Sequence, residues 1–381
     1  MNLDDLRQRT DPLADATLAA LVAGVGLDAA NKALASVVLN TGALPPDLPG
    51  ALTIYFERSG HLPEWADEAK MAAGAELFGE HGPLLLVALI CASLPECYTM
   101  AKGVQVLALT GRMDSTHAYR RIYETAQYVV DVLSPHGLEP FGKGIKAAQK
   151  VRLMHAGIRH LLLTDAPEGL DPASKHFTHV LLSTQWDSAT LGKPICQEDE
   201  LFTLLTFSLV ALRALDAWGV KISPELREGW MHRWAVIGHL MGIEDHLIPR
   251  TEAEAAEVFA AIQAHQVGPT PQGRELTKAL SVFFGQVVDN AWLGRHLGPL
   301  TIRSMVPEAT ADLLGVPKPS STEVTLGRLV QRFLRFVIRT ETPWEQKLIS
   351  RVLVKALTRL PRAWKPGLFQ IPTELTDRWS R

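Results

Sequence analysis

The chain has 381 residues, of which 47% are hydrophobic, so it can bury a large core and is not a disordered polypeptide. Its 38 Lys and Arg residues against 41 Asp and Glu residues give a net charge of −3, which argues against nucleic acid as a partner. Its three cysteines form no CxxC pair and no CxxCH motif, which excludes a cysteine zinc cluster, a disulfide scaffold and covalently attached haem.

Helical periodicity predominates along the chain, and the alternating patterns typical of strands are nearly absent. The sequence therefore predicts an all-α fold. The predicted helices span residues 13–24, 26–40, 65–78, 83–93, 97–110, 115–133, 143–163, 197–218, 223–242, 251–265, 273–295, 323–340 and 343–359. The breaks between them are too short to be flexible linkers, so we expect a single helical domain over residues 1–381.

The N-terminal residues lack the basic region and the apolar region of a secretion signal. The longest apolar run, residues 83–95, is shorter than the roughly 20 residues that cross a membrane. Because the cysteines also show no disulfide pattern, we expect a cytoplasmic protein in a reducing compartment.

The helix predicted over residues 115–133 places Thr125 on its buried stripe and Arg121 one turn earlier, at the edge of that stripe. A buried arginine costs several kcal/mol unless it is paired, so Arg121 must meet an acid or an anionic ligand. Glu124 is the nearest acid on this helix. An intrahelical ion pair and a ligand-binding arginine therefore both remain open.

The segment KVRLMHAGIRHLLL, residues 150–163, places His155 on the apolar face of a helix, with Arg152 and Arg159 on the flank beside it. The apolar face consists of Val151, Met154, Ile158, Leu161 and Leu162. One interpretation is a core histidine that donates to a backbone carbonyl. The other is an axial haem ligand, with the two arginines neutralising the haem propionates.

The C-terminal part carries basic helices. Arginines follow helical spacing beside apolar residues at Arg328, Arg332, Arg335 and Arg339. Helices of this kind mostly cover the protein with their arginine stems and face water, which is the interpretation we adopt, and peripheral contact with anionic lipid is the alternative.

Seven segments, taken in order, resemble the family of haem-dependent oxygenases that includes the latex-clearing proteins (rubber oxygenases) and the fungal MpaB oxygenase. They are LPEWAD (62–67), FGEHG (78–82), LALTGRM (107–113), RRIYETAQYVVDV (120–132), VRLMHAGIRHLLL (151–163), PICQEDELFTLLTFS (194–208) and GWMHRWAVIGHLMGI (229–243). Each segment is short, but their order and spacing over about residues 50–250 are specific.

The resemblance implies a globin-like helical core over about residues 50–250 that holds non-covalent haem b, with additional helices at the N-terminal end and a C-terminal extension over about 251–381. It implies that His155 is the proximal ligand of the iron and that Arg121 and Thr125 lie on the distal side. Helix geometry leads us to expect Arg152 or Arg159 at a propionate. The implied partners are dioxygen and an apolar, lipid-like substrate of the isoprenoid type.

Two features depart from the family pattern. Glu124 stands where latex-clearing proteins have a distal lysine, and residues 97–113 contain no Asp or Glu to match the carboxylate that those enzymes are thought to use as a base. We hypothesise that Glu124 supplies this carboxylate from a different position. The expected function is a haem-b oxygenase that oxidises or cleaves a C=C bond of an apolar substrate. The alternatives are a haem-binding sensor or carrier without turnover, and a structural or lipid-binding helical protein.

Overall fold

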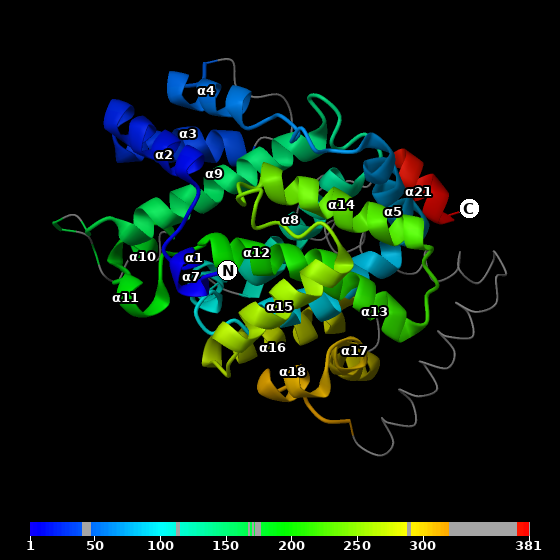
Figure 1. The fold of residues 1–381 in the computed structure, drawn as a ribbon. Coiled ribbons are helices and arrows are strands. Elements are labelled where there is room, and N and C mark those ends of the chain that lie inside the picture. The colour runs from blue at the N-terminus through cyan, green and yellow to red at the C-terminus, as the bar shows by residue number, and fades with distance from the viewer. Residues whose placement is uncertain are drawn as a thin grey trace.

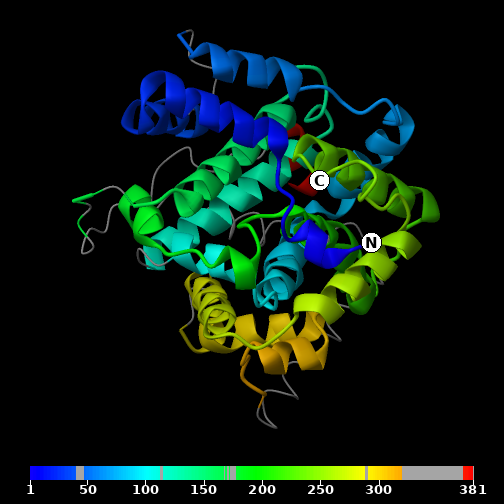
Figure 2. The same cartoon turned by 60° about the vertical axis from the view of Figure 1, so that its left-hand side comes forward.

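The computed structural model describes residues 1–39, 47–111, 115–166, 168–169, 171, 177–287, 291–319 and 372–380. Every regular element within these ranges is a helix, and an isolated antiparallel bridge between Met100 and Val267 is the one β contact there. The all-α prediction is therefore confirmed. Figures 1 and 2 show the helices of residues 12–58 at one end of the molecule and those of residues 271–313 at the opposite end.

The helices α2 (Pro12–Val25) and α3 (Leu27–Leu39) pack on the long helix α9 (Lys143–Leu163), and α4 (Gly50–Arg58) packs on α2. The first helix, α1 (Leu3–Leu6), contacts α12 (Gln197–Leu205) instead. The helix α2 begins where the sequence provides a cap, because the Asp11 side chain accepts the Ala14 N–H at 3.2 Å and Pro12 occupies the first helical position. Apolar side chains such as Leu21 and Leu153 join these helices to α9 in a cluster of their own.

One continuous helical run passes through the core. It comprises α5 (Glu68–Ala88), the π-helical segment η1 (Leu89–Ser93) and α6 (Leu94–Tyr98). The helix α14 (Pro224–Leu240) packs along α5 at close range, since a Cβ on Gly74 would lie only 2.5 Å from the Gly229 carbonyl oxygen.

A second run of the same kind comprises α12 (Gln197–Leu205), the π-helical segment η2 (Thr206–Val210) and α13 (Ala211–Trp218). The two π-helical segments meet, and the Ser93 hydroxyl donates to the Thr206 carbonyl at 2.5 Å. Because π-helical turns are rare and frequently occur at functional sites, this meeting point directs attention to the centre of the molecule.

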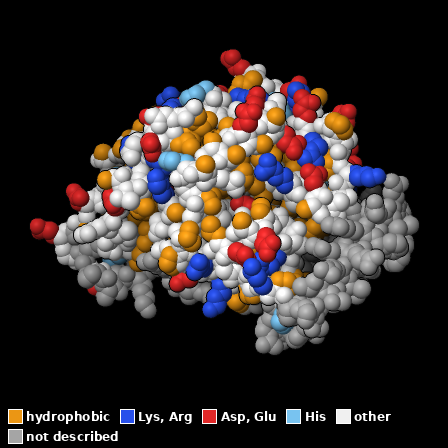
Figure 3. All heavy atoms as spheres, turned by 60° about the horizontal axis from the view of Figure 1, so that its bottom comes forward, with side chains coloured by type: hydrophobic (Ala, Val, Ile, Leu, Met, Phe, Trp, Pro, Cys, Tyr) orange, Lys and Arg blue, Asp and Glu red, His pale blue; other side chains and the backbone are white. Residues whose placement is uncertain are grey.

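Both runs are long and apolar enough to cross a membrane by length and composition. However, 78% of the most apolar window of each run is buried inside the protein, as in the core helices of other folds. On the outer face seen in Figure 3, acidic and basic side chains are intermixed with apolar ones.

The remaining helices complete the two sides of this core. They are α7 (Val104–Gly111), α8 (Ser115–Leu133), α10 (Phe177–Ser183), α11 (Ser188–Leu191), α15 (Glu252–Gln266), α16 (Pro271–Val287), α17 (Ala291–Met305), α18 (Glu308–Leu313) and α21 (Thr373–Ser380). The helices α16 and α17 pack against each other and contact α6 and η1, respectively. The residues of α16 to α18 that are buried belong to the same apolar cluster as α5 and α14.

Several predicted helices have the expected bounds, and others do not. The helices predicted over 115–133 and 143–163 are observed as α8 and α9. Three predictions were wrong: the run over 68–98 continues through Pro83 instead of breaking there, the helix predicted over 97–110 begins only at Val104, and the helix predicted over 273–295 is divided between α16 and α17. The short helices α1, α4, α10, α11, α18 and α21 were not predicted, because each is too short to show a helical period. The helices predicted over 323–340 and 343–359, with their basic residues, lie outside the described residues.

The C-terminal helix α21 returns to the core and packs on α5, beside which it appears in red in Figure 1. Its Trp379 is buried, and the indole N–H donates to the Gly79 carbonyl at 3.1 Å. A Cβ on Gly82 would lie 2.1 Å from this indole ring, so the small residue leaves the space that the ring fills. Glycine in the middle of a helix is therefore explained here by packing.

A buried arginine of α14 holds the C-terminal end of α8. Arg233 is 2% exposed and donates to the carbonyls of Val132, Ser134 and Met71 at 2.7–3.1 Å. Burial lowers the pKa of Arg233 to about 10, so the charge is costly in this place. The last carbonyls of a helix are a favourable site for a cation, which offsets part of that cost.

A buried carboxyl group joins α6 to α18. Glu96 is 2% exposed, and its Oε1 accepts a hydrogen bond from Thr310 at 3.1 Å. Its Oε2 makes no hydrogen bond within the described residues. Burial raises the pKa of Glu96 to about 7, against the opposing effects of Thr310, Arg213 and Gln263.

This carboxyl group predicts a pH dependence of stability. Its pKa is raised in the folded protein above the ordinary value of 4.5, so the stabilisation from protonation is complete below about 4.5 and is lost as the pH rises through about 7. Between pH 5 and pH 8 we expect wild type to lose about 2 to 3 kcal/mol more unfolding free energy than Glu96→Gln, which stays neutral. Urea unfolding at the two pH values measures the difference. The same pH dependence in both proteins would contradict the prediction.

Candidate functional site

Thr125 lines a small apolar pocket where α8 faces the α5–η1–α6 run and η2. The other lining residues are Leu86, Leu89, Ile90, Leu94, Ile122, Ala126, Val129 and Phe207. Thr125 is thus the polar member of an otherwise hydrocarbon lining. The buried stripe on which the sequence places Thr125 is confirmed, because Ile122, Val129 and Val132, which follow the same helical spacing, are all buried. Both π-helical segments contribute to this pocket.

The other two predicted distal residues do not line this pocket. Arg121 donates from Nη1 to the Leu107 carbonyl at 2.7 Å and so ties α8 to α7. Burial raises the pKa of the Tyr98 hydroxyl, and the neighbouring Arg121 guanidinium opposes that rise. Glu124 is exposed. A backbone carbonyl as a partner of Arg121 was not among our expectations.

His155 lies on α9 beside α12, and its Nδ1 is 2.6 Å from the Oε1 of Glu200. The two side chains are 23% and 12% exposed, respectively. The interpretation as a core histidine expected a backbone carbonyl as the acceptor, so the carboxylate is a correction. Within the described part of the chain, Nε2 makes no hydrogen bond. A neutral imidazole that donates from Nδ1 to a carboxylate keeps its Nε2 lone pair available, as metal-ligating histidines do.

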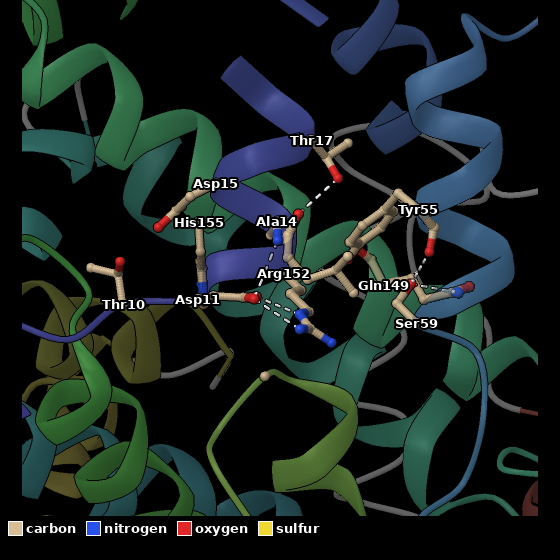
Figure 4. A network of polar contacts seen from close by, with 12 residues as sticks. Thr10, Asp11, Ala14, Asp15, Thr17, Tyr55, Ser59, Gln149, Arg152 and His155 are labelled. Atoms are coloured by element: carbon tan, nitrogen blue, oxygen red, sulfur yellow. Dashed lines mark hydrogen bonds and ion pairs between the residues drawn. The ribbon is translucent and has the colours of Figure 1, made fainter. Parts of the chain in front are cut away.

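Arg152 and Arg159 face the carboxylates of α2, as Figure 4 shows for Arg152 and Asp11. Arg152 pairs through Nε and Nη2 with both oxygens of Asp11. Arg159 donates from Nε to Asp15 at 2.8 Å and from Nη1 to the Ile195 carbonyl at 3.0 Å. Its Nη2 is buried without a hydrogen-bond partner among the described residues. The structure therefore satisfies Arg152 within the protein, and Arg159 keeps one unused donor.

The prediction that Met154 belongs to the buried apolar face of α9 was wrong. Met154 is 38% exposed, whereas its neighbour Leu153 is fully buried against the N-terminal helices. Further along α9, Ile158 and Leu161 pack in another cluster together with Val106. Because α9 is covered from more than one direction, its buried residues do not follow a single stripe, and a one-face projection misplaces Met154.

The first turn of α12 supplies three consecutive acids, and each meets a cation or a histidine from a different part of the chain. Asp199 forms an ion pair with Arg7. Glu198 lies 2.6 Å from Nδ1 of His265 on α15. The third acid is Glu200, the partner of His155. Sequence reasoning missed these residues, although three acids at the start of an apolar helix were a visible signal of a helix N-terminus.

Tyr128 lies on α8 near Glu200, the partner of His155. It follows Thr125 by about one turn, and it is half-buried. Burial raises the pKa of Tyr128, and the charge of nearby Glu200 raises it further. The helix α8 therefore lines the pocket through Thr125 and, about one turn later, carries a phenol that feels the charge of the carboxylate bound to His155.

The pairing of Arg152 with Asp11 predicts a large effect on stability. Asp11→Ala leaves a buried guanidinium without its carboxylate, so we expect the free energy of unfolding to fall by about 3 kcal/mol. Asp5→Ala, which removes an exposed pair with Arg9, should cost less than about 1 kcal/mol. Urea unfolding compares the two variants. Asp11 also caps α2, so the double variant Asp11→Ala with Arg152→Met separates the loss of the ion pair from the loss of the cap. Equal losses of unfolding free energy in Asp11→Ala and Asp5→Ala would refute the prediction.

Comparison with known proteins shows which family the chain resembles. The catalytic-domain family described as ER-bound oxygenase mpaB/B'/Rubber oxygenase matches residues 80–339, which include α8, α9 and α12. The rubber oxygenase of Streptomyces sp. (strain K30) is 28% identical over 321 residues, which are 81% of this chain and 71% of that protein. A solved structure of latex clearing protein LCP in the closed state has a TM-score of 0.72 at 25% identity, and covers 93% of this chain and 91% of its own. The chain therefore belongs to the oxygenase family of mpaB and rubber oxygenase.

Proposed function

We propose that the chain is a haem-b-dependent oxygenase that uses dioxygen to oxidise or cleave a C=C bond of an apolar substrate of the isoprenoid type. Membership of the oxygenase family supports the reaction class, and the relative named rubber oxygenase indicates a hydrocarbon substrate. The observation that carries the proposal is the anchored imidazole of His155, with Nδ1 on Glu200 and Nε2 available for a metal.

The side chains around α9 suit a haem group. His155 would hold the iron through Nε2, and the unused buried Nη2 of Arg159 is a donor that a propionate would satisfy. Arg152 already donates from Nε and Nη2 to Asp11, so it could bind a propionate only through its remaining N–H groups. Bound haem would supply a ferrous centre at which dioxygen binds and is activated.

The apolar pocket suits the other half of the reaction. Its hydrocarbon lining suits contact with an apolar group and disfavours water, which strengthens any hydrogen bond made inside it. The Thr125 hydroxyl would donate that hydrogen bond. Arg121 would act indirectly, since its contact with the Leu107 carbonyl fixes α8 against α7.

The ligand assignment is tested by absorption spectra of wild type, His155→Ala and His160→Ala, expressed with haem precursor and compared at equal protein concentration. We expect a Soret band in wild type and in His160→Ala, and its loss in a folded His155→Ala, since His160 lies on the same helix but is not held by Glu200. Equal bands in wild type and His155→Ala would move the ligand elsewhere, with His160 and His239 next to examine. No band in wild type after added haemin would refute haem dependence.

A haem-binding sensor or carrier without turnover is a second candidate function. The observation that favours it is Glu124, an exposed carboxylate at the position of the distal lysine of latex-clearing proteins. Exposure makes Glu124 a weaker candidate for a base than a group inside the pocket, although a substrate complex can bring it closer.

Oxygen consumption with squalene or polyisoprene as the substrate separates the two functions. For an oxygenase we expect Thr125→Val, which removes one hydroxyl from the pocket, to lower turnover about tenfold with an unchanged Soret band. Glu124→Gln should lower turnover less than about threefold, because its side chain is exposed. The opposite ranking would make Glu124 the base. A haem-loaded wild type that consumes no oxygen with either substrate would favour the sensor or carrier.

A further inference from the structure

Glu200 has a single hydrogen-bond partner among the described residues, which is His155. Its carboxylate accepts from His155 Nδ1 at 2.6 Å and makes no other hydrogen bond within the described ranges. Three neighbouring side chains that feel its charge are His155, Arg152 and Tyr128. Arg152 is already bound by both oxygens of Asp11, and within the described ranges Tyr128 makes no hydrogen bond to Glu200, so neither competes with His155.

The backbone that carries Glu200 is anchored on several sides. Gln197 donates to the carbonyls of Thr10 and Gly242, both at 3.0 Å, and Asp199 pairs with Arg7. These contacts fix the start of α12, so the backbone of Glu200 keeps a constant distance to α9. Groups that must orient a ligand are best placed on such rigid elements.

We infer that Glu200 is a positioning residue for His155: it holds the proton on Nδ1, thereby turns Nε2 toward the metal, and gives the imidazole partial imidazolate character. The inference rests on the proposed haem function. The Glu200 carboxylate would thereby control the electron density at the iron through the proximal ligand, as carboxylates hydrogen-bonded to metal-ligating histidines do at other metal sites. Glu200 need not touch the substrate or dioxygen.

An ordinary structural ion pair is the competing explanation, and the chain offers a matched control for it. Glu198, in the same turn of α12, contacts His265 Nδ1 at 2.6 Å, the same distance between the same atom types. His265 is not a candidate iron ligand, because its Nε2 is 3.1 Å from Asp4. A structural role predicts similar effects for the two glutamates, whereas a positioning role predicts a spectroscopic effect for Glu200 alone.

The test uses haem-loaded wild type, Glu200→Gln, Glu200→Asp and Glu198→Gln. Three properties are measured: the rate of haem loss to an apo-globin acceptor, the midpoint potential, and the Fe–His stretching frequency of the ferrous protein by resonance Raman spectroscopy. In Glu200→Gln we expect haem retention to weaken by roughly 10- to 100-fold, the midpoint potential to rise and the stretching frequency to fall. Glu200→Asp should lie between Glu200→Gln and wild type, and Glu198→Gln should match wild type in potential and frequency.

Thermal unfolding of the haem-free proteins shows whether each variant still folds. Loss of haem from a folded Glu200→Gln, with haem kept by Glu198→Gln, also supports the inference. An unchanged potential and frequency in haem-loaded Glu200→Gln would overturn it and leave the proposed oxygenase function intact. Equal changes in both Gln variants would overturn it in favour of the structural ion pair. A wild type that takes up no haem would refute the proposed function itself, and with it the inference.

Discussion

The pairing of buried charges around the first turn of α12 is the constraint on which the site depends. Glu198, Asp199 and Glu200 enter the interior together, and a buried carboxylate costs several kcal/mol unless a cation or a hydrogen-bond donor meets it. The partners come from three distant places: Arg7 near the N-terminus, His155 on α9 and His265 on α15. Satisfying these three acids therefore brings the N-terminal segment, α9 and α15 to one helix end.

The N-terminal segment extends the same arrangement along α9. Asp11 and Asp15 of α2 pair with Arg152 and Arg159, the arginines on either side of His155. These acids lie before residue 80, where the match to the family begins. Residues outside the matched region thus pair with the two arginines that lie on either side of the proposed iron ligand. The balance of charge along this side of α9 therefore depends on the N-terminal segment as well as on the matched region.

The helix α8 joins this polar region to the apolar pocket. Thr125 faces a lining of hydrocarbon side chains to which both π-helical segments contribute, and Tyr128 lies about one turn further on, near Glu200. Arg121 at one end and the buried Arg233 at the other hold this helix through backbone carbonyls. An apolar pocket and an anchored imidazole are the two features that the proposed oxygenase chemistry requires, since water must be kept from the substrate and the iron ligand must be held in place.

By itself the sequence determined the helical class, the bounds of α8 and α9, and Thr125 and His155 as residues of interest, because a period of 3.6 residues and a polar group among apolar ones are local features. It could not reveal that Pro83 lies inside a continuous helix, that Met154 is exposed, or that Arg233 is buried, since each depends on which other helix packs there. Only the tertiary structure decided the partners: Glu200 is 45 residues from His155, and Asp11 is 141 residues from Arg152. Periodicity shows which face of a helix is buried, but the group that meets a buried charge is set by the packing of distant segments.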